Sequence, residues 1–226
     1  MAPPDPASTT SAVPRSICDL LVIPLGSWEQ HGPHLPFDTD TRIAQELVSR
    51  LERLLPDLVR GPTLTVSASG EHAGFRGTLS IGGEIVTKTV IELVRSADWS
   101  SGVVIVNGHG GNSEYLAHAV DILAREGRSI LIWSPPLVDD TDSHAGLIET
   151  SLMLAIDPAG VRLEEMREGV TEPLGSLMAD LRRGGVISVS PTGVLGDPRG
   201  ANPDLGHALL DDWARRLLDA VVAWVG

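Results

Sequence analysis

The sequence predicts an α/β fold, a three-layer α/β/α sandwich with a mainly parallel central sheet. Two observations carry this prediction. Short apolar runs rich in β-branched residues predict strands buried on both faces, at residues 17–25, 63–67, 103–106, 130–133 and 186–189. Between them, apolar residues recur every three or four positions, as in amphipathic helices. Buried strands that alternate with such helices are typical of a parallel sheet covered on both faces.

Four helical segments carry a clear apolar stripe along one face. Their stripes consist of Ile43, Leu47, Leu51 and Leu55; of Val86, Val90 and Val94; of Leu116, Val120 and Leu123; and of Leu209, Trp213, Leu217 and Val221. Asp204 precedes the last stripe. We expect it to cap that helix, because an Asp side chain accepts hydrogen bonds from the free N–H groups of a helix start.

Length and composition predict one domain over residues 17–226, preceded by a proline-rich, disordered tail over residues 1–16. The chain has 30 acidic and 17 basic residues, and its net charge of −13 would repel nucleic acid and anionic lipid. We therefore expect neither nucleic acid nor a membrane as a partner. The single cysteine, Cys18, cannot form an intrachain disulfide, which suits a cytoplasmic location.

The first polar cluster follows the strand predicted at residues 17–25. Residues 26–41 read Gly-Ser-Trp-Glu-Gln-His-Gly-Pro-His-Leu-Pro-Phe-Asp-Thr-Asp-Thr, with five potential metal ligands. Glu29 and His31 are two residues apart, so an extended chain directs both to one side. The glycine and prolines that follow turn the chain back, bringing Asp38 or Asp40 towards the same place. Taken singly, Asp40 is also a good helix cap and His34 an ordinary surface histidine.

The second cluster, Asn-Gly-His-Gly-Gly-Asn-Ser at residues 107–113, follows the strand predicted at residues 103–106. His109 is exposed to whatever that loop contains. Gly110 and Gly111 offer backbone N–H groups at a helix start, so a nucleotide-binding module using this Gly-rich loop is an alternative. The glycine spacing matches neither of the common nucleotide-binding loops, which disfavours that alternative.

Two further clusters complete the pattern. Residues 142–151 read Asp-Ser-His-Ala-Gly-Leu-Ile-Glu-Thr-Ser, so His144 and Glu149 stand five residues apart in a loop that enters a helix. Residues 71–78 read Glu-His-Ala-Gly-Phe-Arg-Gly-Thr, a turn of mixed polarity that contains Glu71, His72 and Arg76.

Together these motifs resemble the creatininase family of metal-dependent amidohydrolases, over about residues 21–151. By that resemblance Glu29, His31, Asp40 and His109 match the ligands of two divalent metal ions, with Asp40 bridging them, and His144 matches a histidine beside the substrate. The resemblance also implies the α/β/α fold and a homo-oligomer, with a hexamer favoured.

The chain departs from creatininase itself in one place. That enzyme has a carboxylate two residues after its counterpart of His109, where Gly111 stands here, so creatinine is disfavoured as the substrate. The first cluster looks most like the actinobacterial mycofactocin-system subgroup. That subgroup removes a C-terminal Val-Tyr dipeptide from a modified precursor peptide during redox-cofactor biosynthesis.

The resemblance and the chemistry of the residues together predict a mechanism. Two ions, Zn with Fe or Mn, would generate a bridging hydroxide that attacks the amide. Because Gly111 leaves one ion short of a carboxylate, we expect Glu149 to be a ligand as well as a catalytic residue. His144 would donate a proton to the departing nitrogen, and the N–H groups of Gly110 and Gly111 would assist the oxyanion.

Glu71, His72 and Arg76 are expected to contact the substrate, with Arg76 holding a substrate carboxylate. Other possibilities remain open at this point: hydrolysis of creatinine or another cyclic amide, deformylation of a formamide in cofactor biosynthesis, or a metal-stabilised scaffold without activity.

Overall fold

The central sheet of the computed structural model has four parallel strands, in a structure that describes residues 19–225. The strands are β1 (Leu20–Leu25), β2 (Val59–Arg60), β3 (Gly102–Asn107) and β4 (Ile130–Trp133), in the spatial order β2-β1-β3-β4. The tail predicted at residues 1–16 lies outside the described residues, as does Cys18.

Strands β1 and β3 form the centre of the sheet and pair along their whole length, from Leu20 with Gly102 to Leu25 with Asn107. Successive side chains point to opposite faces, so Ile23 and Ile105 enter one core and Val22 and Val104 enter the other. All four side chains are fully buried. The α/β prediction is therefore confirmed, and for the reason given: both faces of the sheet are covered.

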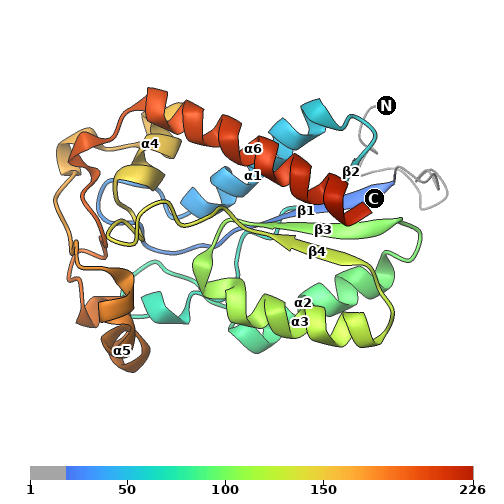
Figure 1. Ribbon diagram of the computed structural model, residues 1–226. Helices are drawn as coiled ribbons and strands as arrows, with labels where there is room; N and C mark the ends of the chain where they lie inside the picture. The colour runs from blue at the N-terminus through green and yellow to red at the C-terminus, as the bar shows by residue number, and fades with distance from the viewer. Residues whose placement is uncertain (1–18, 226) are drawn as a thin grey trace.

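Helices cover the two faces (Figure 1). On one face lie α1 (Thr39–Leu54), α4 (Leu147–Ile156) and α6 (Pro203–Val225), and on the other lie α2 (Gly83–Ser96) and α3 (Ser113–Arg125). A further helix, α5 (Leu174–Gly184), lies beyond the carboxyl ends of the strands, where the sequence pattern had not indicated one. Short 3₁₀ helices occupy Gly70–His72, Gly110–Asn112, Pro158–Gly160, Leu163–Glu165, Val186–Ser188 and Pro198–Gly200.

Within the part of the chain that is described, none of these helices combines the length and the apolar character that crossing a bilayer requires.

The strand predicted at residues 63–67 is wrong in position. The edge strand is β2, which pairs Val59 and Arg60 with β1. The Gly61 N–H still donates to the Val22 carbonyl at 2.8 Å, but regular pairing with β1 ends at Arg60. Of the predicted segment, only Leu64 touches the sheet, through an isolated bridge to Leu25.

The strand predicted at residues 186–189 is also wrong, because Val186–Ser188 forms a 3₁₀ helix. Gly185 has a φ of 69°, which turns the chain immediately after α5. The Ser190 N–H then donates to the Val186 carbonyl at 2.8 Å, closing a local turn. Ile187 is 42% exposed, so this apolar run lacks the two-sided burial that a central strand needs.

Helix α6 begins earlier than its sequence suggests. The Asn202 side-chain oxygen accepts a hydrogen bond from the Leu205 N–H at 2.9 Å, so Asn202 caps the helix. Asp204 lies inside the first turn instead, where its charge favours the helix dipole. The expected cap at Asp204 is therefore wrong by two residues.

We expect Asn202→Ala to lower the free energy of unfolding by about 1 kcal/mol, because it leaves an N–H group of the first turn without a partner. Asp204→Ala is the matched control and should cost only a few tenths of that amount, since it removes only a dipole interaction. Urea unfolding of both variants measures the difference. A larger loss from Asp204→Ala would return the capping role to that residue.

Candidate metal centre

The first turn of α1 lies against the ends of both central strands because two glycines permit the approach. A Cβ added at Gly26, just after β1, would lie 2.2 Å from the Thr41 hydroxyl. A Cβ at Gly108, just after β3, would lie 2.4 Å from the Asp40 carbonyl oxygen. Any larger residue at these positions would move α1 away. The side chain of Asp40 is thereby held between the two loops that carry the predicted ligands.

Asp40 joins the loops after β1 and β3. Its Oδ1 lies 3.0 Å from His31 Nε2, and its Oδ2 lies 3.1 Å from His109 Nδ1. Ser27 donates a further hydrogen bond to Oδ2 at 2.7 Å. Burial would raise the pKa of Asp40, but the charge of His31 and the hydrogen bonds from both histidines hold it well below its ordinary value. One carboxylate thus presents a different oxygen to each of two imidazoles.

His31 shows the strength of the negative field in this site. Burial would lower the pKa of its imidazole, yet the Asp40 carboxylate raises it to about 10. Its Nδ1 lies 3.0 Å from the Glu29 carbonyl oxygen and donates to it, so Nε2 is the atom that faces the site. A field that attracts a proton to Nε2 also attracts a metal cation to the same atom, and the two compete.

The environment of the Glu29 carboxylate indicates whether a metal ion fits this site. Its side chain is fully buried, and neither carboxylate oxygen forms a hydrogen bond with the described residues. Its Oε1 lies 3.2 Å from His72 Nε2, 3.3 Å from His109 Nδ1 and 3.9 Å from His144 Nδ1. A buried carboxylate without hydrogen bonds is costly unless a cation balances it. The residues present therefore fit a divalent metal ion.

Several overlapping groups of side chains could hold such an ion, with ligand atoms within 4.8 Å of one another. Among the described residues they are Glu29, His31 and Asp40; His31, His144 and Glu149; Glu29, His72 and His144; and Glu29, Glu71 and His109. Mixed carboxylate and imidazole donors suit Zn, Mn or Fe(II) better than Mg or Ca.

Glu149 lies in the first turn of α4, close to His31. Its Oε2 is 3.9 Å from His31 Nε2 and accepts a hydrogen bond from the Ala145 N–H at 2.6 Å. Burial raises the pKa of Glu149 to about 7, although the charge of His31 opposes the rise. Ala145 adopts a left-handed conformation, with φ of 53°, that is rare outside glycine. The loop therefore bends sharply as it brings His144 and Glu149 to the same cluster.

His144 and His72 are connected through Gln30. The side-chain amide nitrogen of Gln30 lies 2.8 Å from His72 Nδ1. The main-chain carbonyl oxygen of Gln30 lies 2.8 Å from His144 Nε2. A proton on Nε2 makes that second bond and leaves His144 Nδ1 as an acceptor directed towards Glu29. Burial and the charges of His31 and His72 hold the pKa of His144 well below its ordinary value. His144 is thus neutral at pH 7 and must accept a proton before it can donate one.

Glu71 supports His109 from the opposite side. His109 Nε2 donates to the Ala68 carbonyl oxygen at 2.8 Å and lies 3.3 Å from Glu71 Oε1, which leaves Nδ1 for the metal side. A Cβ added at Gly111 would lie 2.0 Å from Glu71 Oε1. The glycine in this motif therefore makes room for the Glu71 carboxylate.

Three residues weighed from the sequence lie elsewhere. Asp38 forms an ion pair with Arg42 at 2.8 Å, and His34 is bound to the Thr150 hydroxyl at 2.9 Å. Arg76 is exposed and is not among the residues that line the cavity above the metal centre. That it holds a substrate carboxylate stays a prediction. The turn at residues 71–78 places Glu71 and His72 at the site but leaves Arg76 outside it.

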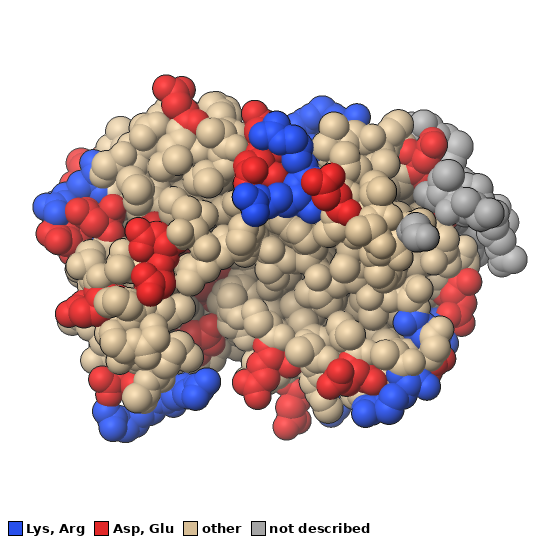
Figure 2. Space-filling model, in the orientation of Figure 1, with Lys and Arg blue, Asp and Glu red and all other residues tan. Residues whose placement is uncertain are grey.

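A cavity of about 400 Å³ opens directly onto this cluster. Figure 2 shows the corresponding hollow between the region of α5 and the start of α3, with acidic side chains inside it. The predicted residues that line it are Glu29, Asp40, Glu71, His72, His109, Gly110, Gly111, His144 and Glu149. Its remaining wall comes largely from α5, with Leu174, Met178, Leu181 and Arg182. None of these four residues is among those predicted from the sequence.

A family model described as creatininase, creatinine amidohydrolase, matches residues 8–221 of the chain. The chain belongs to the creatininase family. It is a hydrolase of amide bonds, in a family whose members depend on metal ions. The mycofactocin precursor peptide peptidase of Mycolicibacterium smegmatis is 43% identical, covering 96% of this chain and 90% of that protein.

Further similarity extends over nearly the whole chain. The mycofactocin precursor peptide peptidase of Mycobacterium tuberculosis is 45% identical, covering 93% of this chain and 89% of that protein. Among solved structures, a crystal structure of creatinine amidohydrolase (creatininase) superposes with a TM-score of 0.73 at 23% identity, covering 90% of this chain and 89% of the other. That structure supports the fold alone.

Replacing the central aspartate tests the arrangement around it. Altering a group that only orients a metal ligand lowers metal affinity or activity by roughly 10- to 100-fold. Asp40→Asn should lower both metal affinity and turnover by more than this. Asp38→Asn is the control and should change both by little, because it removes only a partly exposed pair with Arg42. Metal analysis and turnover assays of the two purified variants measure the losses. Equal losses in the two variants would contradict the central role given to Asp40.

Glu149→Gln tests whether the carboxylate beside His31 holds an ion. The variant keeps the shape of the side chain but removes its charge, so we expect it to retain about one ion per subunit and to lose nearly all turnover. Elemental analysis of the folded variant gives the ratio. Two ions per subunit with normal turnover would mean that Glu149 is not a ligand.

Proposed function

We propose that this protein is a dinuclear metal-dependent peptidase that removes the C-terminal Val-Tyr dipeptide from the modified mycofactocin precursor peptide. The observation that carries the proposal is the Glu29 carboxylate, which is buried without a hydrogen bond among three imidazoles. The identity of 43% and 45% to the mycofactocin precursor peptide peptidases supports the choice of substrate.

In this proposal Glu29, Asp40 and His109 would hold one ion, and His31, Asp40 and Glu149 would hold the other. The shared Asp40 directs one oxygen to each histidine, which supports a bridging role. Two divalent ions in such a site supply an activated water and polarise the scissile carbonyl. Zinc with iron or manganese suits these donors.

Side-chain and backbone groups of the chain transfer the proton and stabilise the developing charge in this proposal. His144, neutral at pH 7, can take a proton at Nδ1 and return it to the departing amine, with Nε2 fixed by the Gln30 carbonyl. Gly110 and Gly111 line the cavity, and we assign their backbone N–H groups as donors to the carbonyl oxygen as negative charge develops.

The cavity suits an apolar dipeptide. Leu174, Met178 and Leu181 of α5 contribute apolar side chains to the cavity that the charged ligands also line. Burial of the valine and tyrosine side chains against these residues would favour binding and exclude water from the reaction. The resemblance of the motifs further supports a homo-oligomer, with a hexamer favoured, and the single cysteine supports a cytoplasmic location.

The test is to incubate the purified protein with the modified precursor peptide and to identify the products by mass spectrometry. We expect release of the C-terminal dipeptide, abolished by a chelator and restored by Zn, Fe(II) or Mn, because no Gly-x-Ser-x-Gly motif provides an alternative nucleophile. Creatinine and a formamide serve as comparison substrates. Hydrolysis of either one in place of the peptide, or full activity in a verified metal-free sample, would overturn the proposal.

A further inference from the structure

Charge is distributed unevenly around the cavity above the metal centre. Its charged lining consists of Glu29, Asp40, Glu71, Glu149 and a single Lys or Arg residue among those described, Arg182. The whole chain carries a net charge of −13. A substrate that carries a carboxylate is therefore repelled by most of the protein and needs a local cation where it enters.

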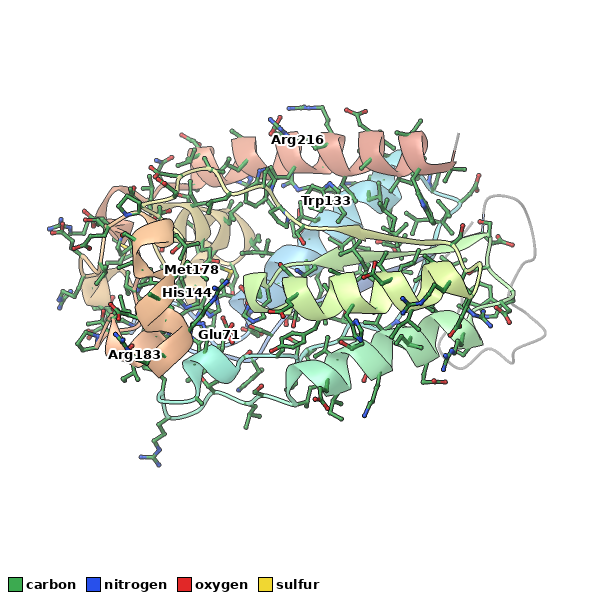
Figure 3. The ribbon with its side chains drawn as sticks, turned by 60° about the horizontal axis from the view of Figure 1, so that its bottom comes forward. Glu71, Trp133, His144, Met178, Arg183 and Arg216 are labelled. Carbon is green, nitrogen blue, oxygen red and sulfur yellow. The ribbon has the colours of Figure 1, made fainter. Side chains whose placement is uncertain are left out.

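Helix α5 presents Arg182 on the same face as two apolar residues of the cavity lining. Leu174, Met178 and Arg182 are spaced four residues apart, so they share one side of the helix. Figure 3 shows Met178 on α5 beside His144, with Glu71 nearby, and all three line the cavity. Arg182 continues this row by one turn towards the end of the helix.

Arg182 has donors to spare. The guanidinium forms no hydrogen bond or ion pair with the described residues, and the side chain is exposed. Its neighbour Arg183 differs in two respects: it is ion-paired with Asp180 and does not line the cavity. Figure 2 shows basic side chains gathered at the α5 edge of the hollow. An unpaired guanidinium at this edge offers a planar set of donors that matches a carboxylate.

We infer that Arg182 is a specificity residue that binds a carboxylate of the peptide substrate at the α5 edge of the cavity. This inference rests on the proposed function, because it takes the peptide as the substrate. Arg182 is preferred to Arg76 for this role, because Arg182 lines the cavity and Arg76 does not. The carboxylate is either the C-terminus of the peptide or an acidic side chain within it, and both present the same two oxygens to the guanidinium.

The experiment compares Arg182→Ala, Arg182→Lys and the control Arg183→Ala in the metal-loaded enzyme. Three peptides are used: the unaltered precursor, the precursor with a C-terminal carboxamide, and the precursor with its Asp and Glu residues changed to Asn and Gln. We expect Arg182→Ala to raise KM for the unaltered peptide by about tenfold to a hundredfold with little change in kcat. Arg182→Lys should be intermediate, and Arg183→Ala should behave as the unaltered enzyme.

Comparison of the three peptides identifies which substrate carboxylate Arg182 binds. In the unaltered enzyme one of the two modified peptides should show the same rise in KM, and Arg182→Ala should then add nothing further. A rise with the carboxamide assigns the C-terminus, and a rise with the Asn and Gln peptide assigns a side chain. If Arg182→Ala weakens all three peptides equally, or weakens none, the inference is overturned.

A binding measurement separates this inference from the proposed function. Titration calorimetry with a precursor whose scissile amide is N-methylated gives Kd without turnover. If the enzyme cleaves no peptide, the proposed function fails, yet a Kd that weakens about tenfold or more in Arg182→Ala, and not in Arg183→Ala, still supports carboxylate binding. An unchanged Kd in Arg182→Ala overturns the inference whether or not the peptide is cleaved.

Discussion

The buried carboxylate of Glu29 sets the main constraint on this structure, because a charge without hydrogen bonds at the end of the sheet must be balanced from close by. The imidazoles of His72, His109 and His144 surround it, and each is held by a bond to another segment. The loops after β1 and β3, the turn before α2 and the entry to α4 are thereby tied to one point. The charge of a metal ion at that point would stabilise all of these segments together.

The same field links metal binding to protons. The raised pKa of His31 means that protonation of its imidazole stabilises the metal-free fold, fully below about pH 6.5 and less as the pH rises through about 10. An ion that binds at Nε2 must displace this proton, so its affinity increases with pH over that range. A proton and a metal ion would therefore compete for this nitrogen.

Much of the fold and of the cluster followed from the sequence. Strands β1 and β3 were predicted because they are buried on both faces, and β4 was predicted from its apolar run although it is only partly buried. The apolar runs at residues 63–67 and 186–189 are interrupted or half exposed. The residues around Asp40 were grouped because their motifs follow the ends of adjacent strands. Arg182 was missed because α5 is far from the four motifs in the sequence. The apolar stripe of α5, formed by Leu174, Leu177, Met178 and Leu181, is only half-buried, and the helix meets the motifs only in the folded chain.

Gly111 and Glu71 illustrate how the side chain at one position can restrict the residue allowed at a distant position in the sequence. The Glu71 carboxylate fills the volume in which any side chain at residue 111 would begin. A side chain at residue 111 would therefore need the Glu71 carboxylate and the His109 ring to move from their present positions. An exchange of the carboxylate between residues 71 and 111 would have to change both residues together, since either change alone leaves a collision or an empty space.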